Sequence, residues 1–215
     1  RSPRKESSAA SDVYKRQAMS THVSKAMKEH KHPLADFGYC PKCGSDQFKV
    51  ENAKAKRCGG CGFTYYFNPS AACTCFITDK LNRVLVAVRG ADPAKGTYDL
   101  PGGFIDPYET AEEGMAREIK EETRISALSG LRGGIVDPLR YLFSLPNIYL
   151  YSGFEVHTVD MVFHMAVESL DPYIGVGGDD VAELKAIPFS ELDPETFGLD
   201  SIRKAVEMVK SARYF

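Results

Sequence analysis

The segment from Gly103 to Ile125, GFIDPYETAEEGMAREIKEETRI, places acidic residues at fixed spacing on what reads as one helix. Glu118 and Glu122 are four residues apart, and Glu121 is three residues after Glu118. The helical period therefore puts the three carboxylates on one face. Like charges arranged in this way repel by roughly a few tenths of a kcal/mol per pair unless positive charge lies among them. A hard divalent cation such as Mg²⁺, which prefers oxygen ligands, is the simplest resolution of this repulsion.

The predicted helix is well specified at its start and along one side. Thr110 is a good N-cap, and Glu113 follows it at the spacing of a capping box. Met115, Ala116 and Ile119 form an apolar stripe beside the carboxylates. One side of the helix can therefore pack on a sheet while the adjoining side lines an open site.

A solvated acidic face is the alternative interpretation, and for a Glu-rich helix taken alone it is the better one. The segment before the helix changes this balance. Leu100–Gly103, LPGG, is a Gly-rich turn that leads from an extended run toward the helix. Glycines at such a place allow the backbone to approach a ligand closely, which favours a binding site.

These residues resemble the Nudix box, G-x5-E-x7-R-E-U-x-E-E-x-G-U, in which U is a bulky aliphatic residue. One position departs, because Arg124 stands where the family has glycine. That glycine ends the helix as a left-handed C-cap, a conformation that has a steric cost for arginine. The positions that match are Gly103, Glu109, Arg117, Glu118, Ile119, Glu121, Glu122 and Ile125.

The resemblance implies an enzyme that uses Mg²⁺ or Mn²⁺ to hydrolyse the pyrophosphate bond of a nucleoside diphosphate linked to another group. ADP-ribose and NADH are substrates of this kind, and the product is a nucleoside monophosphate. By similarity, Glu118 and Glu122 are metal ligands, and Glu121 is a ligand or the base that orients water. The Gly103 carbonyl is a further ligand in this scheme. Glu109 and Arg117, which complete the catalytic set, are expected to pair and to shape the loop.

Two further sets of residues are candidates for the same site. Some relatives take the base from a later acidic loop, although a solvated turn is at least as good an interpretation; the local carboxylates are Asp179, Asp180 and Glu183. Aromatic residues flank the box and could stack on a base, although core packing is the better expectation for each; they are Tyr98, Phe104 and Tyr108.

The cysteines predict a second metal site. Cys40 and Cys43 form one C-x-x-C pair, Cys58 and Cys61 form another, and fourteen residues separate the pairs. Two such pairs present four thiolates to one tetrahedral Zn²⁺, and a site filled by four thiolates is structural. Two disulfides are the alternative, which an intracellular location disfavours. The remaining cysteines, in AACTCFI, are expected to be inert residues of a buried strand.

The order of elements predicts an α/β fold. We expect strands at 71–77, 84–88, 148–154, 159–167 and 181–189, with a closing helix at 199–212. The resemblance implies a Nudix-type α/β/α sandwich with a mixed sheet, preceded by a small zinc ribbon. The expected divisions are a disordered or non-native tail at 1–34, the ribbon at 35–66 and the Nudix domain at 67–215.

The ribbon before the box also resembles the NADH pyrophosphatase branch of the family. That branch carries a Ser-Gln-Pro-Trp-Pro-Phe-Pro signature after the box, and this chain has no tryptophan. Specificity for NADH or capped RNA is therefore left open.

Three other functions compete with hydrolysis. A non-catalytic nucleotide-sensing module would usually lose box carboxylates, which this chain keeps. Nucleic-acid binding is the second alternative: the ribbon is mildly basic, but no stacking aromatic residues alternate with its charges. An allylic diphosphate isomerase is the third alternative and ranks low. The net charge of −2 implies no attraction to nucleic acid or membrane, and no apolar run is long enough to cross a bilayer. We expect a cytoplasmic protein, with a homodimer as one open option.

Overall fold

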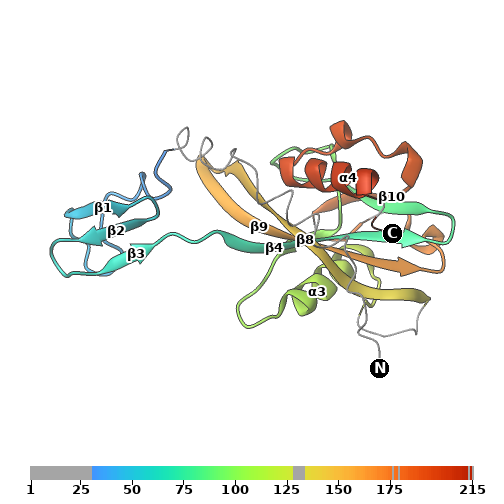
Figure 1. The fold of residues 1–215 in the computed structure, drawn as a ribbon, viewed down its shortest axis with the longest axis horizontal. Helices are drawn as coiled ribbons and strands as arrows, with labels where there is room; N and C mark the ends of the chain where they lie inside the picture. The colour runs from blue at the N-terminus through green and yellow to red at the C-terminus, as the bar shows by residue number, and fades with distance from the viewer. Residues whose placement is uncertain (1–30, 128–133, 176, 179, 213, 215) are drawn as a thin grey trace, which may run out of the picture. The chain divides into compact units, whose positions relative to one another are not determined.

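A computed structural model describes residues 31–127, 134–175, 177, 178, 180–212 and 214. The chain divides into two compact units, Arg1–Phe67 and Asn68–Phe215 (Figure 1). Of the tail expected at 1–34, residues 1–30 lie outside the described part of the chain, whereas Leu34 is buried and hydrogen-bonded and thus belongs to the ordered first unit. Within that part, no helix combines the length and the apolar character that crossing a membrane requires.

The first unit is a three-stranded antiparallel sheet. Its strands are β1 (Phe48–Asn52), β2 (Ala55–Cys58) and β3 (Thr64–Tyr66), and β2 lies in the middle. Its buried apolar cluster is small and consists of Cys40, Phe48 and Cys58, with Phe63 packed against them. So small a core gives little hydrophobic stabilisation, which makes cross-linking by a metal ion important for this unit.

The second unit is built on a mixed seven-stranded sheet between two helices, which confirms the predicted α/β class. The strand order is β10-β5-β4-β9-β8, with β6 paired to β5 and β7 paired to β4. Only the β4–β9 pair is parallel among these pairs. The strands are β4 (Ser70–Asp79), β5 (Arg83–Arg89), β6 (Tyr98–Asp99), β7 (Gly102–Phe104), β8 (Ile135–Tyr151), β9 (Phe154–Val167) and β10 (Val181–Pro188).

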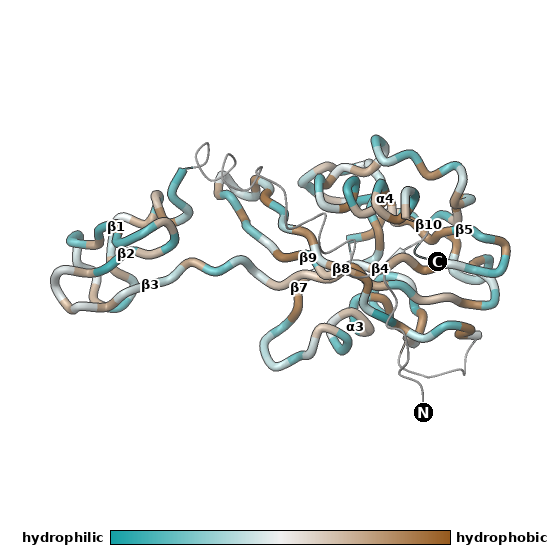
Figure 2. Tube along the Cα trace, in the orientation of Figure 1, coloured by the Kyte–Doolittle hydropathy of each residue, from teal (hydrophilic) through white to brown (hydrophobic). Residues whose placement is uncertain are grey.

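Helices α3 (Ala111–Thr123) and α4 (Asp200–Ala212) cover opposite faces of this sheet (Figure 1). Three short 3-10 helices lie near the carboxyl end, η1 (Asp171–Tyr173), η2 (Phe189–Glu191) and η3 (Pro194–Thr196). Figure 2 shows hydrophobic residues concentrated on the central strands, with hydrophilic residues on the peripheral loops. The central strands are thus buried from both sides, which explains their nearly continuous apolar runs.

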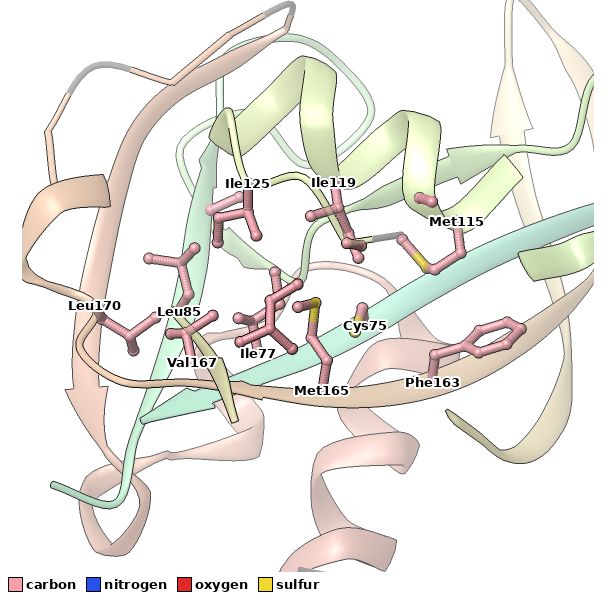
Figure 3. Close-up of a cluster of buried hydrophobic side chains, with 14 of the residues drawn as sticks. Cys75, Ile77, Leu85, Met115, Ile119, Ile125, Phe163, Met165, Val167 and Leu170 are labelled. Carbon is pink, nitrogen blue, oxygen red and sulfur yellow. The ribbon is translucent and has the colours of Figure 1, made fainter. Parts of the chain in front are cut away.

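Alternation along the central strands creates the two cores. Cys75 and Ile77 of β4 point toward α3, where Met115 and Ile119 pack against them (Figure 3). The residue between them, Phe76, points to the other face and joins the core under α4. Residues of that second core include Val84, Val86, Val162, Ile202, Val206 and Val209. The apolar stripe predicted for α3 is confirmed by this packing.

The ends of α3 follow the sequence signals. Thr110 accepts a hydrogen bond from the Glu113 N–H, and the Glu113 side chain accepts one from the Thr110 N–H, so the predicted capping box is present. Arg124 is the C-cap, in the left-handed conformation with φ of 66°. Its N–H donates to the Lys120 carbonyl at 2.9 Å. The chain therefore keeps the left-handed helix exit although it lacks the glycine that favours it.

The prediction for β8 was wrong in length. The sequence indicated a strand only at 148–154, whereas β8 begins at Ile135 and ends at Tyr151. Pro138 and Pro146 lie inside it and mask it in the sequence, since proline normally interrupts a sheet. β8 is an edge strand, where proline is tolerated, and its pairing with β9 has three register shifts. The turn expected at 155–158 occurs instead at Ser152 and Gly153.

Replacing Arg124 with glycine should stabilise the second unit. Arg124→Gly removes the steric cost of a left-handed residue with a Cβ, and we expect a gain of about 1 kcal/mol in the free energy of unfolding. Lys204→Gly, at an exposed position inside α4, should instead lower it by about 1 kcal/mol. Urea denaturation of both variants measures this; a loss of stability in Arg124→Gly would contradict the account.

Candidate active site

The candidate site forms where β7 runs close to both β4 and α3. Two glycines make this approach possible. A Cβ on Gly102 would lie 2.1 Å from the Cys73 carbonyl oxygen, and a Cβ on Gly103 would lie 2.6 Å from the Glu118 carboxyl carbon. Gly102 also has φ of 157°, a value that residues with a Cβ rarely adopt. Position 102 therefore requires glycine, whereas a Cβ at position 103 would displace the end of the Glu118 side chain.

Arg117 lies at the centre of the acidic cluster. Its Nε donates to Glu109 Oε1 at 2.8 Å, which is the pairing that the sequence predicted. Its Nη1 also donates to Glu118 at 2.8 Å and to Glu121 at 3.0 Å. Its Nη2 reaches the Phe104 carbonyl at 2.9 Å. Arg117 thus supplies part of the positive charge that was expected among the carboxylates. Its hydrogen bonds also connect α3 to the segment before it.

Glu122 has a different environment. It is 6% exposed, and its Oε2 accepts a hydrogen bond from the Gly102 N–H at 2.9 Å. No basic side chain of the described residues bonds to it. Burial raises the pKa of Glu122 well above its ordinary value, the Gly102 N–H opposes this, and the nearby Asp99, Glu118 and Asp180 carboxylates add to it. Glu122 is thus a buried acid without a compensating cationic side chain among the described residues.

Of the later acidic residues proposed for this site, one lies beside it and one does not. The Gly178 N–H donates to the Glu122 carbonyl at 2.9 Å, so the loop packs against the carboxyl end of α3. Asp180 lines the adjacent cavity. Glu183 is exposed on β10 and pairs with Lys185 at 3.2 Å instead. Asp179 lies outside the described residues.

A cavity of about 460 Å³ adjoins β7. Its walls come from β4, β8, β9, the residues after β5 and the start of α4, and Gly102, Gly103 and Phe104 form one side. This volume is in the range of roughly 300–1,000 Å³ that small-molecule sites occupy. The two glycines therefore lie at the border between the acidic cluster and a cavity of ligand size.

Sequence analysis missed the polar residues of this cavity. Asp99 is buried and accepts from Arg89 Nη1 at 2.5 Å, and Asp160 is buried and accepts from the Ser201 hydroxyl at 2.5 Å. Thr158, which is 3% exposed, also lines the cavity. A signal was present, because Asp160 interrupts the apolar run of β9 and Asp99 directly precedes the LPGG turn.

The flanking aromatic residues have different environments. Tyr98 packs against the core under α4, as expected, with its ring 6.1 Å from that of Phe197. Phe104 is 45% exposed and lines the cavity, and Tyr108 is fully exposed, so the expectation of core packing was wrong for these two residues. Phe104 is the last residue of β7, and Tyr108 lies in the loop that follows it.

The four cysteines of the first unit converge, as the spacing predicted. Their Sγ atoms all lie within 4.8 Å of one another, and they form the only such cluster of possible metal ligands among the described residues. Cys40 and Cys61 are 3.8 Å apart at sulfur, and Cys43 and Cys58 are 3.6 Å apart. Tetrahedral zinc with Zn–S bonds of about 2.3 Å requires sulfurs roughly 3.8 Å apart, so the geometry fits this ion.

The cysteine cluster is not a pair of disulfides, since all six cysteines of the chain are free. The Cys61 N–H bonds to Cys58 Sγ at 3.5 Å and lowers the pKa of Cys58 to about 6, whereas hydrogen bonds with the other three thiols contribute to raising the pKa of Cys43 to about 12, so without a metal the four thiols share their protons unevenly. Cys73 and Cys75 are buried, and burial raises the pKa of Cys73 to about 12. Both are therefore unreactive core thiols, as predicted.

Solved structures of low sequence identity share this fold. A Nudix hydrolase from Nitrosomonas europaea aligns with a TM-score of 0.57 and 21% identity, over 82% of this chain and 92% of its own. The Nudix domain of NrtR from Shewanella oneidensis, solved with ADP ribose, aligns with a TM-score of 0.52 and 16% identity, over 68% of this chain and 89% of its own. At these identities the comparison establishes the fold alone.

Curated relatives match parts of the chain. An NAD-capped RNA hydrolase, NudC, from Vibrio parahaemolyticus is 33% identical over 103 residues, which are 48% of this chain and 38% of the relative. An ADP-ribose pyrophosphatase from Methanocaldococcus jannaschii is 44% identical over 61 residues, which are 28% of this chain and 36% of the relative. The chain thus spans well under half the length of these two proteins.

The family itself is established over a longer stretch. The sequence model of the NUDIX domain matches residues 68–207, which is more than half of the chain and nearly the whole second unit. The mixed sheet between α3 and α4, the box residues on α3 and this match agree with one another. The chain therefore belongs to the Nudix family.

Proposed function

We propose that the second unit hydrolyses the pyrophosphate bond of a nucleoside diphosphate linked to another group, with the help of a divalent cation such as Mg²⁺. The product would be a nucleoside monophosphate. The single observation that carries this proposal is the position of Glu122, a buried carboxyl near Glu118 that accepts a hydrogen bond from the N–H of Gly102, a residue that lines the cavity.

The donor set fits a hard cation. Glu118 and Glu122 are both nearly buried, and Arg117 bonds to Glu118 but not to Glu122. Gly103 lies close to Glu118, and its carbonyl, which accepts from the Cys73 thiol at 3.6 Å, would add an oxygen of the type that Mg²⁺ and Mn²⁺ prefer. A cation bound to this cluster would offset the charge that Glu122 and its acidic neighbours concentrate there.

Each residue has a distinct role in the proposed reaction. Glu118, Glu122 and the Gly103 carbonyl would hold the cation, which when bound neutralises charge on the pyrophosphate oxygens and activates a water. Among Glu118, Glu121 and Glu122, Glu121 has the most exposed side chain, at 48%, and would orient the attacking water and accept its proton. Arg117 and Glu109 would keep the loop against the helix, so that these groups stay in register.

Asp180 is the alternative base, because it lines the cavity while the other described carboxylate of that region, Glu183, pairs with Lys185. The substrate would place its pyrophosphate against α3 and one of its two organic groups in the cavity. Phe104, at the cavity wall, is exposed enough to stack on such a group.

We further propose that the ribbon, residues 35–66, binds one structural Zn²⁺ through Cys40, Cys43, Cys58 and Cys61. The sulfur separations and the four-thiolate donor set support a closed tetrahedral site. The small apolar cluster of this unit makes its fold dependent on the ion.

Replacing Glu122 with glutamine tests the catalytic proposal. Glu122→Gln keeps an oxygen that can accept from the Gly102 N–H, so the fold should persist, while the charge that holds the cation is lost. We expect kcat/KM for ADP-ribose with Mg²⁺ to fall by roughly 100-fold or more. Glu112→Gln, on the exposed first turn of the same helix, is the matched control and should retain full activity. Normal turnover in Glu122→Gln would exclude α3 as the active site.

Metal removal tests the zinc proposal. Metal analysis of the purified chain should find one zinc bound, and Cys40→Ser should lose it while Cys73→Ser keeps it. After chelation, amide hydrogen exchange should rise in β1–β3 and stay unchanged in the central strands β4 and β5. Protein that contains no zinc, or a ribbon that stays protected after chelation, would overturn this assignment.

A further inference from the structure

The cavity beside β7 is acidic, which restricts the part of a substrate that can enter it. Of the residues that the structure describes, four aspartates line it, Asp92, Asp99, Asp160 and Asp180, against the single basic residue Arg89. The guanidinium of Arg89 is already used, since its Nε donates to the Pro93 carbonyl at 2.7 Å and its Nη1 to Asp99. A second phosphate would be repelled from this cavity, whereas an uncharged group rich in hydrogen-bond donors would not.

The wall formed by β8 and β9 offers such donors a set of partners. Asn147 lies directly across from Thr158 in the strand pairing, and Asp160 follows two residues later on the same face of β9. All three residues line the cavity and are less than 10% exposed. The start of α4 fixes the last of them, because the Ser201 hydroxyl donates to Asp160 Oδ2.

Thr158 is the residue that points to a ligand. Its Oγ1 is fully buried and has no hydrogen-bond partner among the described residues. A buried hydroxyl without a partner is costly, so a ligand group that bonds to it gains affinity without having to displace an existing bond. The cavity that Thr158 lines is large enough to receive that group.

We propose that Asn147, Thr158 and Asp160 recognise the base of the substrate and select a 6-aminopurine over a 6-oxopurine. This inference rests on the proposed function. Asp160 already acts as an acceptor for the Ser201 hydroxyl, and a second acceptor oxygen there favours an exocyclic amino group over a carbonyl oxygen at the same place. An asparagine amide can at once accept from the amino group of adenine and donate to its ring nitrogen. The Thr158 hydroxyl supplies a further donor or acceptor to the same base.

Measuring the binding of ligands that the enzyme cannot hydrolyse tests base recognition independently of catalysis. Isothermal titration calorimetry of the full chain with zinc and Mg²⁺ would use AMP, IMP and ribose 5-phosphate, none of which contains a pyrophosphate bond. We expect wild type to bind AMP roughly tenfold more tightly than IMP, and ribose 5-phosphate more weakly than either. If wild type binds AMP and IMP equally, or ribose 5-phosphate as tightly as AMP, the inference is overturned even where ADP-ribose is hydrolysed.

Two variants assign the effect to residues. Asp160→Asn retains an acceptor for Ser201 and adds donors, so it should bring the affinities for AMP and IMP to within about threefold of each other. Thr158→Val should weaken AMP binding by about fivefold. Thr196→Val, the same change at an exposed hydroxyl in η3, should leave binding unchanged. Unchanged preference in Asp160→Asn, or unchanged affinity in Thr158→Val, would contradict the assignment; thermal unfolding of each variant confirms that it is folded.

Discussion

The close approach of β7 to β4 and α3 at Gly102 and Gly103 determines the rest of the candidate site. Side chains at these positions would collide with the Cys73 carbonyl and with the Glu118 carboxylate. The approach brings the Gly102 N–H to Glu122 and leaves the cavity on the neighbouring side of the strand. Gly178 makes a similar contact, since a Cβ there would lie 2.0 Å from the Glu121 carbonyl oxygen. At Gly102 and Gly178 this approach to neighbouring backbone is possible only because the positions lack side chains, whereas at Gly103 an added Cβ would displace the Glu118 carboxylate.

The charges around this point divide into two groups. Arg117 compensates Glu109, Glu118 and Glu121, so most of the acidic helix face is already stable without a ligand. Within the described part of the chain, the Glu122 side chain accepts only from a backbone N–H, and Asp99 and Asp180 add negative charge near it. This uneven compensation explains why a cation is expected at Glu122, with Glu118 as a neighbouring ligand. It also gives the cavity its acidic character, which favours an uncharged substrate group there.

Much of the fold and of the acidic cluster could be predicted from local signals. The capping box at Thr110, the stripe at Met115 and Ile119 and the paired C-x-x-C motifs each depend on residues close in sequence. β8 and the cavity could not be predicted, because they depend on contacts between distant segments. Asn147 and Thr158 meet only through the register of β8 and β9, and Ser201 reaches Asp160 only once α4 has packed on the sheet. The αL conformation of Arg124 shows the reverse case, in which tertiary packing keeps a helix exit that local preference opposes.

The most direct test of the central claim is Gly103→Ala, with stability and activity measured on the same protein. The added methyl group would meet the flexible end of Glu118, so the midpoint of thermal unfolding should change little while the carboxylate is displaced. A displacement of this kind is expected to lower kcat/KM for ADP-ribose by roughly 100-fold. Gly38→Ala, where no atom lies within 4 Å of the new Cβ, should match wild type in both measurements. Wild-type activity in folded Gly103→Ala would contradict the account.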